Sequence, residues 1–176
     1  MRKIVHTLVQ ILDLQSEKRL EILRLAKLAY LSDYLYAKTF EKGKPFTGNY
    51  RRFTYGPVPN GFYDALDMLE RQGVIKRVGN FIKLQKSVET SLNKEEQACI
   101  EKAVDDFRSV STARLLRIAY DTEPMKEIQE KETALGTKLQ YETVDFSLVE
   151  EHPLLKNLEK VDPSFLRSKE YLTTLE

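Results

Sequence analysis

Tyr55-Gly56-Pro57-Val58-Pro59 joins two different sequence patterns near the middle of the chain. Residues 49–55 are rich in β-branched and aromatic side chains and therefore predict a strand. Apolar residues recur between Phe62 and Leu69 at the three-to-four spacing of one helical face, which predicts a helix. Each proline fixes its own φ and keeps the residue before it out of the α region. We therefore expect a stiff, extended connection between this strand and this helix.

The helix after this connection has recognisable ends in the sequence. Asn60 has the side chain of an N-cap, and Gly73 has the backbone freedom needed just beyond a last helical turn. The two residues predict a helix of about three turns.

A long apolar segment precedes the junction. Ser16 is expected to cap a helix that reaches Tyr36 or Lys38, and apolar residues surround most of that helix instead of one face. We therefore expect this helix to be the central packing element. A shorter helix over residues 4–14 precedes it, and residues 38–48, which contain glycine and proline, form a loop after it.

A hairpin is expected after the junction helix. Residues 74–84 contain Gly79-Asn80, which is typical of a two-residue hairpin turn. With this turn Ile75, Ile82 and Leu84 share one face, which we expect in the core, and Lys76 and Lys83 share the other. Together with the strand before Tyr55, this hairpin predicts a small antiparallel sheet of about three strands.

Three more helices follow in the sequence. Asn93 and Glu96 form a capping-box pattern at the start of the first. Ser109 or Ser111 caps the second, and Pro124 fits the first turn of the third.

These elements predict a mostly helical α+β fold with a small antiparallel sheet and a loosely winged-helix-like order. We expect one domain over residues 1–132. Residues 133–176, where the periodicity weakens, are expected to be a partly ordered C-terminal extension that packs on or beside the domain.

Four motifs occur together in this sequence. They are the run Leu28-Ala29-Tyr30-Leu31-Ser32-Asp33-Tyr34, the glycine and proline within residues 42–47, the Tyr-Gly-Pro-Val-Pro junction and Tyr63-Asp64-Ala65-Leu66. Over about residues 16–124 the sequence resembles the SocA-like, Panacea-type antitoxin domain of bacterial and phage toxin–antitoxin systems.

The resemblance implies a function. It implies an antitoxin that binds and neutralises a toxin protein by direct contact, in some relatives as an adaptor that presents the toxin to a protease. It also implies a phage-associated system in which the toxin is the product of an adjacent gene. Because domains of this family pair with unrelated toxins, the resemblance does not name the toxin.

The composition is that of a globular protein, with 41% hydrophobic and 31% charged residues. No apolar run reaches the ~18 residues of a membrane span, so we expect no membrane association and a cytoplasmic location. The single Cys99 permits no intramolecular disulfide. With His6 and His152 it also offers too few ligands for a usual zinc site.

Motifs of known catalytic sites are not found in the sequence. Neither histidine lies near a Gly-x-Ser-x-Gly elbow or a cysteine–histidine signature, and the chain has no Walker or Gly-x-Gly-x-x-Gly loop. The spacing of Asp64 and Asp67 does not single out either as a catalytic carboxylate. We therefore expect a protein that is not an enzyme and that uses no cofactor or metal.

The charge is unevenly distributed along the chain. Residues 1–60 contain eleven Lys and Arg against five Asp and Glu, whereas residues 121–176 contain seven against thirteen. The two ends can neutralise each other in the fold, or the basic end can form a surface for an acidic partner. Weak contact with the DNA backbone through the basic N-terminal third is one form of the second alternative.

The alternative function is a winged-helix-like DNA-binding transcriptional regulator. The helix after the junction would then read DNA, and the hairpin over residues 74–84 would be the wing. That helix carries Asp64, Asp67 and Glu70 against Arg71 alone. This charge opposes contact with phosphates and favours the antitoxin interpretation.

Asp33 is a carboxylate within an apolar segment, so it must face solvent or accept hydrogen bonds. A structural role, with donors in the following loop or in the basic strand, and a role in partner contact are both open. Tyrosine beside arginine is typical of protein interfaces. The candidate partner-binding residues are therefore Asp33, Tyr34, Arg51, Arg52, Tyr55 and Pro57.

Overall fold

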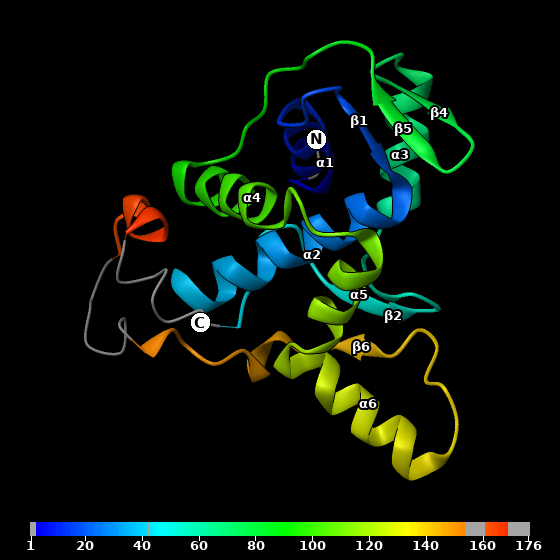
Figure 1. Ribbon diagram of the computed structural model, residues 1–176, viewed down its shortest axis with the longest axis vertical. Helices are drawn as coiled ribbons and strands as arrows, with labels where there is room; N and C mark the ends of the chain where they lie inside the picture. The colour runs from blue at the N-terminus through cyan, green and yellow to red at the C-terminus, as the bar shows by residue number, and fades with distance from the viewer. Residues whose placement is uncertain (1–2, 42, 154–160, 169–176) are drawn as a thin grey trace.

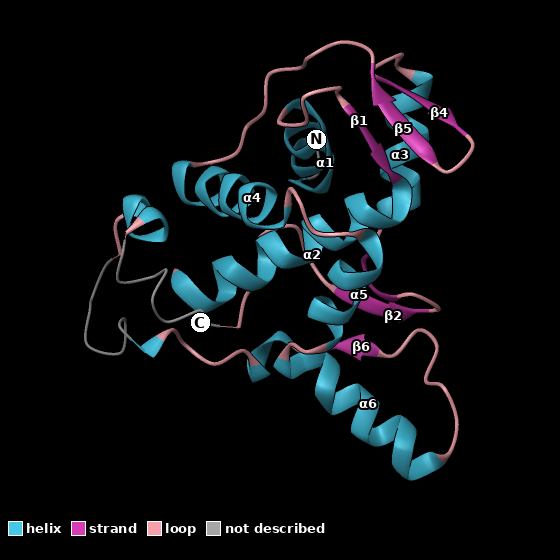
Figure 2. Ribbon diagram, in the orientation of Figure 1, coloured by secondary structure: helices cyan, strands magenta, loops and turns pink. Residues whose placement is uncertain are grey.

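The computed structural model describes residues 3–41, 43–153 and 161–168 (Figure 1). Over these residues the chain forms six α-helices, which are α1 (Lys3–Asp13), α2 (Ile22–Thr39), α3 (Phe62–Arg71), α4 (Lys94–Phe107), α5 (Thr112–Tyr120) and α6 (Glu123–Leu135). Six strands accompany them (Figure 2), which are β1 (Arg19–Glu21), β2 (Tyr50–Phe53), β3 (Gly56–Pro59), β4 (Ile75–Val78), β5 (Phe81–Leu84) and β6 (Thr143–Val144). Short 3₁₀ helices follow at η1 (Phe146–Leu148) and η3 (Pro163–Arg167). The mostly helical α+β fold is confirmed.

Helix α2 is the central element, as its sequence predicted. Helices α1, α4 and α5 and strand β3 pack against it, and Figure 1 shows it running through the middle of the molecule. Residues 25–33 of α2 are all buried. Because burial of one large aliphatic side chain contributes about 1.5–3 kcal/mol, this segment is a major source of stability. It also buries two charged residues, Lys27 and Asp33.

Two antiparallel sheets replace the single sheet expected from the sequence. One has the strand order β1-β5-β4 and the other β3-β2-β6. The hairpin turn at Gly79-Asn80 is confirmed, with Val78 opposite Phe81. The single sheet was a wrong prediction because β2 pairs with β3 on one side and β6 on the other. Both sides of β2 are therefore occupied, and the β4–β5 hairpin pairs with β1 instead.

The expected start of the long helix at Ser16 is wrong. Residues 19–21 form β1, and α2 begins at Ile22. Leu20 is buried and lies opposite Ile82 of β5. Pairing with the β4–β5 hairpin therefore decides the structure of this segment, although its sequence has helical periodicity. Strand formation in general depends strongly on such tertiary contacts.

The segment expected to be a stiff, extended connection is strand β3. It pairs with β2, with Phe53 opposite Gly56 and Tyr50 opposite Pro59. Proline has no N–H to donate and is therefore confined largely to edge strands, and β3 is an edge of its sheet. The extended backbone predicted for Pro57 and Pro59 is confirmed, and pairing with β2 makes this segment a strand.

The predicted N-cap of α3 also needs correction. Gly61, with φ +76°, occupies that position, and the Asn60 N–H donates to the Asn49 carbonyl at 2.8 Å. A left-handed backbone at the helix start favours glycine over asparagine. Gly73 lies just beyond α3 with φ +66°, as predicted.

The predicted starts of the later helices are confirmed. Asn93 and Glu96 form the capping box of α4, Ser111 caps α5, and Pro124 lies in the first turn of α6. Asn93 and Ser111 accept hydrogen bonds from backbone N–H groups that have no partner within the first helical turn. Pro124 has no N–H that would need such a partner.

The chain after α6 returns to the body of the fold. Val144 of β6 lies opposite Tyr50 of β2. Phe146 is buried, with its ring 5.7 Å from that of Tyr30 and 5.3 Å from that of Tyr50. Helix η3 packs against α4. The division of the chain between residues 132 and 133 stays a prediction.

Candidate partner-binding surface

The β2–β3 hairpin carries four of the six candidate partner-binding residues. Its strand β3 packs on α2 and α5. Thr54 and Tyr55 form the turn between the paired Phe53 and Gly56. Gly56 has φ +88°, a conformation that favours glycine. Because side chains alternate along a strand, Tyr50 is buried whereas Arg51 is exposed.

Lys27 of α2 lies beneath the hairpin and is fully buried. Its Nζ donates to the Pro57 carbonyl at 2.6 Å. Burial, assisted by the positive charge of Arg52, lowers the pKa of Lys27 to about 7. Lys27 therefore connects the backbone of β3 to the central helix.

Arg52 is the second buried basic residue under the hairpin, with its side chain 2% exposed. It forms an ion pair with Glu132 of α6, in which Arg52 Nε lies 2.7 Å from Oε1. Its Nη2 lies 3.4 Å from Oε2 of the same carboxylate. The guanidinium carbon is 5.9 Å from the ring centroid of Tyr120, which is within the range of a cation–π contact.

Glu132 receives further donors besides Arg52. The Leu139 N–H donates to Oε1 at 2.9 Å, and Lys138 Nζ lies 3.2 Å from Oε2. Burial raises the pKa of Glu132, but the hydrogen bonds from Leu139, Arg52 and Lys138 outweigh it and leave the pKa below its ordinary value. Glu132 is therefore ionised near neutral pH and holds β2 against α6.

Asp33 of α2 anchors the loop that precedes β2. Its Oδ1 accepts the N–H groups of Phe46 at 2.6 Å and Thr47 at 3.1 Å. Its Oδ2 accepts the Tyr50 hydroxyl at 2.5 Å and also the Thr47 hydroxyl. Burial raises the pKa of Asp33 to about 7, although these hydrogen bonds act in the opposite direction. The carboxylate is thus bound by the loop and by Tyr50, and not by the arginines of β2.

The outer side of the β2–β3 hairpin carries exposed aromatic residues. Tyr55 is 61% exposed and Tyr141 is 59% exposed. The Tyr141 ring packs edge-on against that of Phe53 at 5.1 Å, and its N–H donates to the Arg52 carbonyl at 2.7 Å. Arg51 forms no ion pair or side-chain hydrogen bond with any residue that the structure describes. We call Arg51, Phe53, Tyr55 and Tyr141 the hairpin tip.

Residues 25–125 match a family model described as antitoxin SocA-like, Panacea domain. This match covers more than half of the chain. The chain belongs to this family. The matched residues run from α2 to the first turn of α6 and include the whole β2–β3 hairpin. Comparison with curated proteins and with solved structures gave no match.

The six predicted partner-binding residues of this Panacea chain lie at different depths. Arg51 and Tyr55 are exposed, and Tyr34 is half-buried. Buried residues make up the other half of the set, which are Asp33, Arg52 and Pro57. In this conformation a partner can reach Arg51 and Tyr55, whereas the buried three hold the loop and the hairpin in place. Partner binding by these residues stays a prediction.

Sequence reasoning missed Lys27, Glu132 and Tyr141. Lys27 gives the same signal as Asp33, since it is a charged residue inside an apolar helix, and that signal could have found it. Glu132 is 80 residues from Arg52. Its position and that of Tyr141 follow from tertiary contacts, which leave no local pattern in the sequence.

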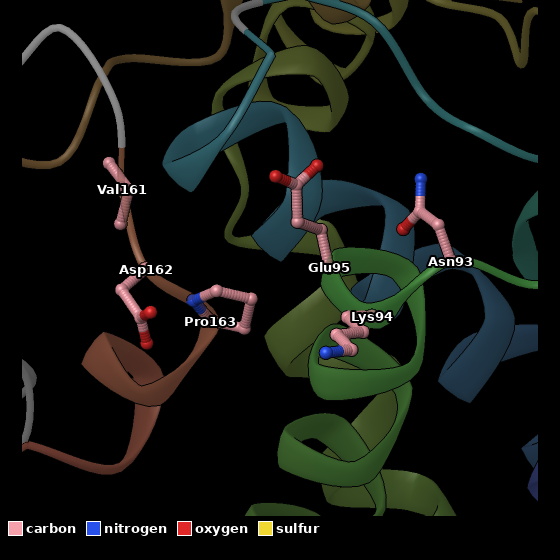
Figure 3. Close-up of a pocket in the computed structure, with 6 residues that line it drawn as sticks. All are labelled: Asn93, Lys94, Glu95, Val161, Asp162 and Pro163. Atoms are coloured by element: carbon pink, nitrogen blue, oxygen red, sulfur yellow. The ribbon is translucent and has the colours of Figure 1, made fainter.

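A hollow of about 530 Å³ lies between the first turn of α4 and the residues at the start of η3. Figure 3 shows its lining residues on two sides, which are Asn93, Lys94 and Glu95 on one and Val161, Asp162 and Pro163 on the other. This lining pairs no nucleophile with a base, so it gives no support to a catalytic site.

Within residues 3–41, 43–153 and 161–168, no three His, Cys, Asp or Glu residues gather in a group that could hold a metal ion. The helices of the same residues are too short or too polar to cross a membrane.

Proposed function

We propose that this Panacea protein neutralises a toxin protein by direct contact through the hairpin tip. The antitoxin family implies a toxin partner in general. The observation that supports this location is the exposure of Arg51, Tyr55 and Tyr141, of which Arg51 forms no ion pair or side-chain hydrogen bond with a described residue. Tyrosine and arginine supply many of the strongest contacts in protein interfaces.

The support beneath the hairpin tip favours binding. Lys27 holds the β3 backbone, and the ion pair of Arg52 with Glu132 holds β2 against α6. A surface that is already ordered loses less conformational entropy when a partner binds. A typical interface buries about 1,600 Å² in total, so surfaces near the tip must also contribute. Leu135, which is 64% exposed on α6, is one candidate.

The wider setting is also a proposal. The protein acts as a binding module, without catalysis, cofactor or metal, on a toxin encoded by an adjacent gene of a phage-associated locus. Both proteins act in the cytoplasm. The regulator alternative gains no support from α3, because Asp64 and Asp67 are exposed on the helix that would read DNA.

The test is coexpression with the product of each adjacent gene. The protein should restore growth that the toxin alone arrests, and the two should copurify. Arg51→Glu and Tyr55→Ala should weaken the complex, mainly by faster dissociation. The matched controls are Arg114→Glu on α5 and Tyr63→Ala on α3, both exposed residues of the same types.

Three outcomes would contradict the proposal. If the protein fails to restore growth with the product of every adjacent gene, it is not an antitoxin of those products. If the control variants weaken the complex as much as the tip variants do, the toxin does not bind specifically at the hairpin tip. A complex that forms normally with both tip variants would lead to the same conclusion.

The mode of neutralisation needs a separate measurement. The half-life of the toxin is compared in cells with and without the protein, and again in cells that lack ATP-dependent proteases. A shorter half-life that depends on the proteases would indicate an adaptor. An unchanged half-life with restored growth would indicate that the antitoxin covers the active surface of the toxin.

A further inference from the structure

The outer face of the β1-β5-β4 sheet carries a row of three cations. Arg19 of β1 lies opposite Lys83 of β5, and Lys83 lies opposite Lys76 of β4. All three side chains are exposed. Because neighbouring strands lie about 4.8 Å apart, this cation row extends over about 10 Å of the sheet.

Few carboxylates of the described residues neutralise the charges of this row. Lys76 and Lys83 form no ion pair or side-chain hydrogen bond there. The Arg19 guanidinium lies over the Phe81 ring, 4.1 Å from its centroid. Like charges directly opposite each other destabilise a strand pair. The row therefore opposes the stability of the sheet that carries it, and an external anion would relieve this repulsion.

Nearby acidic residues are occupied elsewhere. Glu21 shares the outer face of β1 with Arg19 and accepts a hydrogen bond from the Thr112 hydroxyl at 2.5 Å. Asp67 and Glu70 of α3 both form ion pairs with Arg77, at 2.7 and 2.6 Å. The Thr112 hydroxyl leaves the charge of Glu21 in place, but three cations against this one carboxylate leave the sheet face with a net positive charge.

We propose that the cation row binds the phosphate backbone of a nucleic acid. Lysine is depleted in interfaces between proteins, whereas Lys and Arg neutralise phosphates in complexes with nucleic acids. Cations repeated at the spacing of neighbouring strands suit a regular polyanion. Contacts of this kind carry no sequence information, so the binding is independent of sequence.

This surface is separate from the hairpin tip. Figure 1 shows the β1-β5-β4 sheet with α3 at one end of the molecule and β2, β6 and α6 towards the other. Toxin binding at the tip and nucleic-acid binding at the row therefore do not compete for one surface. The proposal does not depend on the proposed antitoxin function.

The test measures the anisotropy of labelled duplex DNA of two unrelated sequences over a range of salt concentrations. Neutralisation of three phosphates predicts a slope of about −2.7 for log K against log salt, the same for both sequences. Lys76→Gln with Lys83→Gln should reduce that slope by about 1.8 and weaken binding. Lys126→Gln, an exposed lysine of α6, is the matched control and should change neither.

Thermal unfolding of each variant checks the fold, and removal of like charges should leave the unfolding temperature unchanged or higher. The proposal is overturned if duplex DNA does not bind at the lowest salt concentration. It is also overturned if Lys126→Gln weakens binding as much as the double variant. Binding of poly-glutamate but not of DNA, dependent on Lys76 and Lys83, would identify an acidic protein partner instead.

Discussion

Arg52 and Glu132 lie 80 residues apart in the chain and form a buried ion pair. Arg52 Nε is 2.7 Å from Glu132 Oε1, and the two side chains are 2% and 5% exposed. The family match ends at residue 125, before this glutamate. The hairpin of the matched region is therefore held by a residue that lies outside the match.

Removal of one member of this pair should destabilise the protein strongly. Arg52→Met leaves the Glu132 carboxylate buried without its arginine, which typically costs about 3–5 kcal/mol. The measurement is the free energy of unfolding in urea. Arg51→Met is the matched control, because the neighbouring arginine is exposed and its loss should change stability by less than about 0.5 kcal/mol. Equal effects of the two variants would contradict the structural role of the pair.

Asp33 should make stability depend on pH in the acidic range. Its pKa is raised to about 7 in the folded protein, whereas an unfolded chain has a value of about 3.9. Between these values the folded state holds a proton that the unfolded state has released. The contribution of Asp33 to the free energy of unfolding therefore falls as pH rises from about 4 to about 7.

The comparison for this prediction is with Asp33→Asn, which retains an acceptor oxygen and does not titrate. The stability of the wild type relative to this variant should decline over that pH range and stay level above it. A difference that is constant with pH would show that Asp33 titrates normally. Asp33→Ala, which strands the donors of the loop, should cost about 1–3 kcal/mol.

Lys27 should make the free energy of unfolding rise with pH in the alkaline range, opposite to the effect of Asp33. Its pKa falls to about 7 in the folded protein, against about 10.4 in an unfolded chain. Between these values the unfolded state binds the extra proton, so stability rises with pH by up to about 1.4 kcal/mol per pH unit. Lys27→Met should remove this rise. If the free energies of unfolding of the wild type and of Lys27→Met change with pH in parallel from pH 7 to pH 10, the lowered pKa of Lys27 is contradicted.

The parts of the fold that the sequence predicted are those that local patterns encode. The apolar girth of α2, the Gly79-Asn80 turn and the capping box of Asn93 with Glu96 each depend on residues close together in the chain. The parts that it did not predict depend on distant pairing. Leu20 lies in a strand because Ile82 pairs with it. No property of residues 16–21 alone contains that information.

The same distinction applies to the candidate surface. The sequence located the strand that carries Arg51 and Arg52, and it recognised that Asp33 needs donors. It could not tell that Arg52 points inward while Arg51 points outward, because the direction depends on the register of β2. It also could not place Tyr141 against Phe53, since this contact depends on the return of the chain after α6.

Gly56→Ala should destabilise the hairpin through two separate effects. Gly56 has φ +88°, and an added Cβ would lie 3.3 Å from Tyr120 Cε2. Gly79 has φ +58° with nothing within 4 Å of an added Cβ, so Gly79→Ala measures the backbone effect alone. Alanine at such a φ costs about 1 kcal/mol, and Gly56→Ala should cost more because Tyr120 must also move.

A double-mutant cycle isolates the contact with Tyr120. Tyr120→Leu removes the part of the ring that the new methyl group would meet. If crowding contributes, Gly56→Ala should cost less in the Tyr120→Leu background than in the wild type, with a coupling of at least about 0.5 kcal/mol. Urea unfolding of the four proteins supplies the cycle. Equal costs of Gly56→Ala and Gly79→Ala, together with zero coupling, would show that the hairpin needs glycine for its backbone conformation alone.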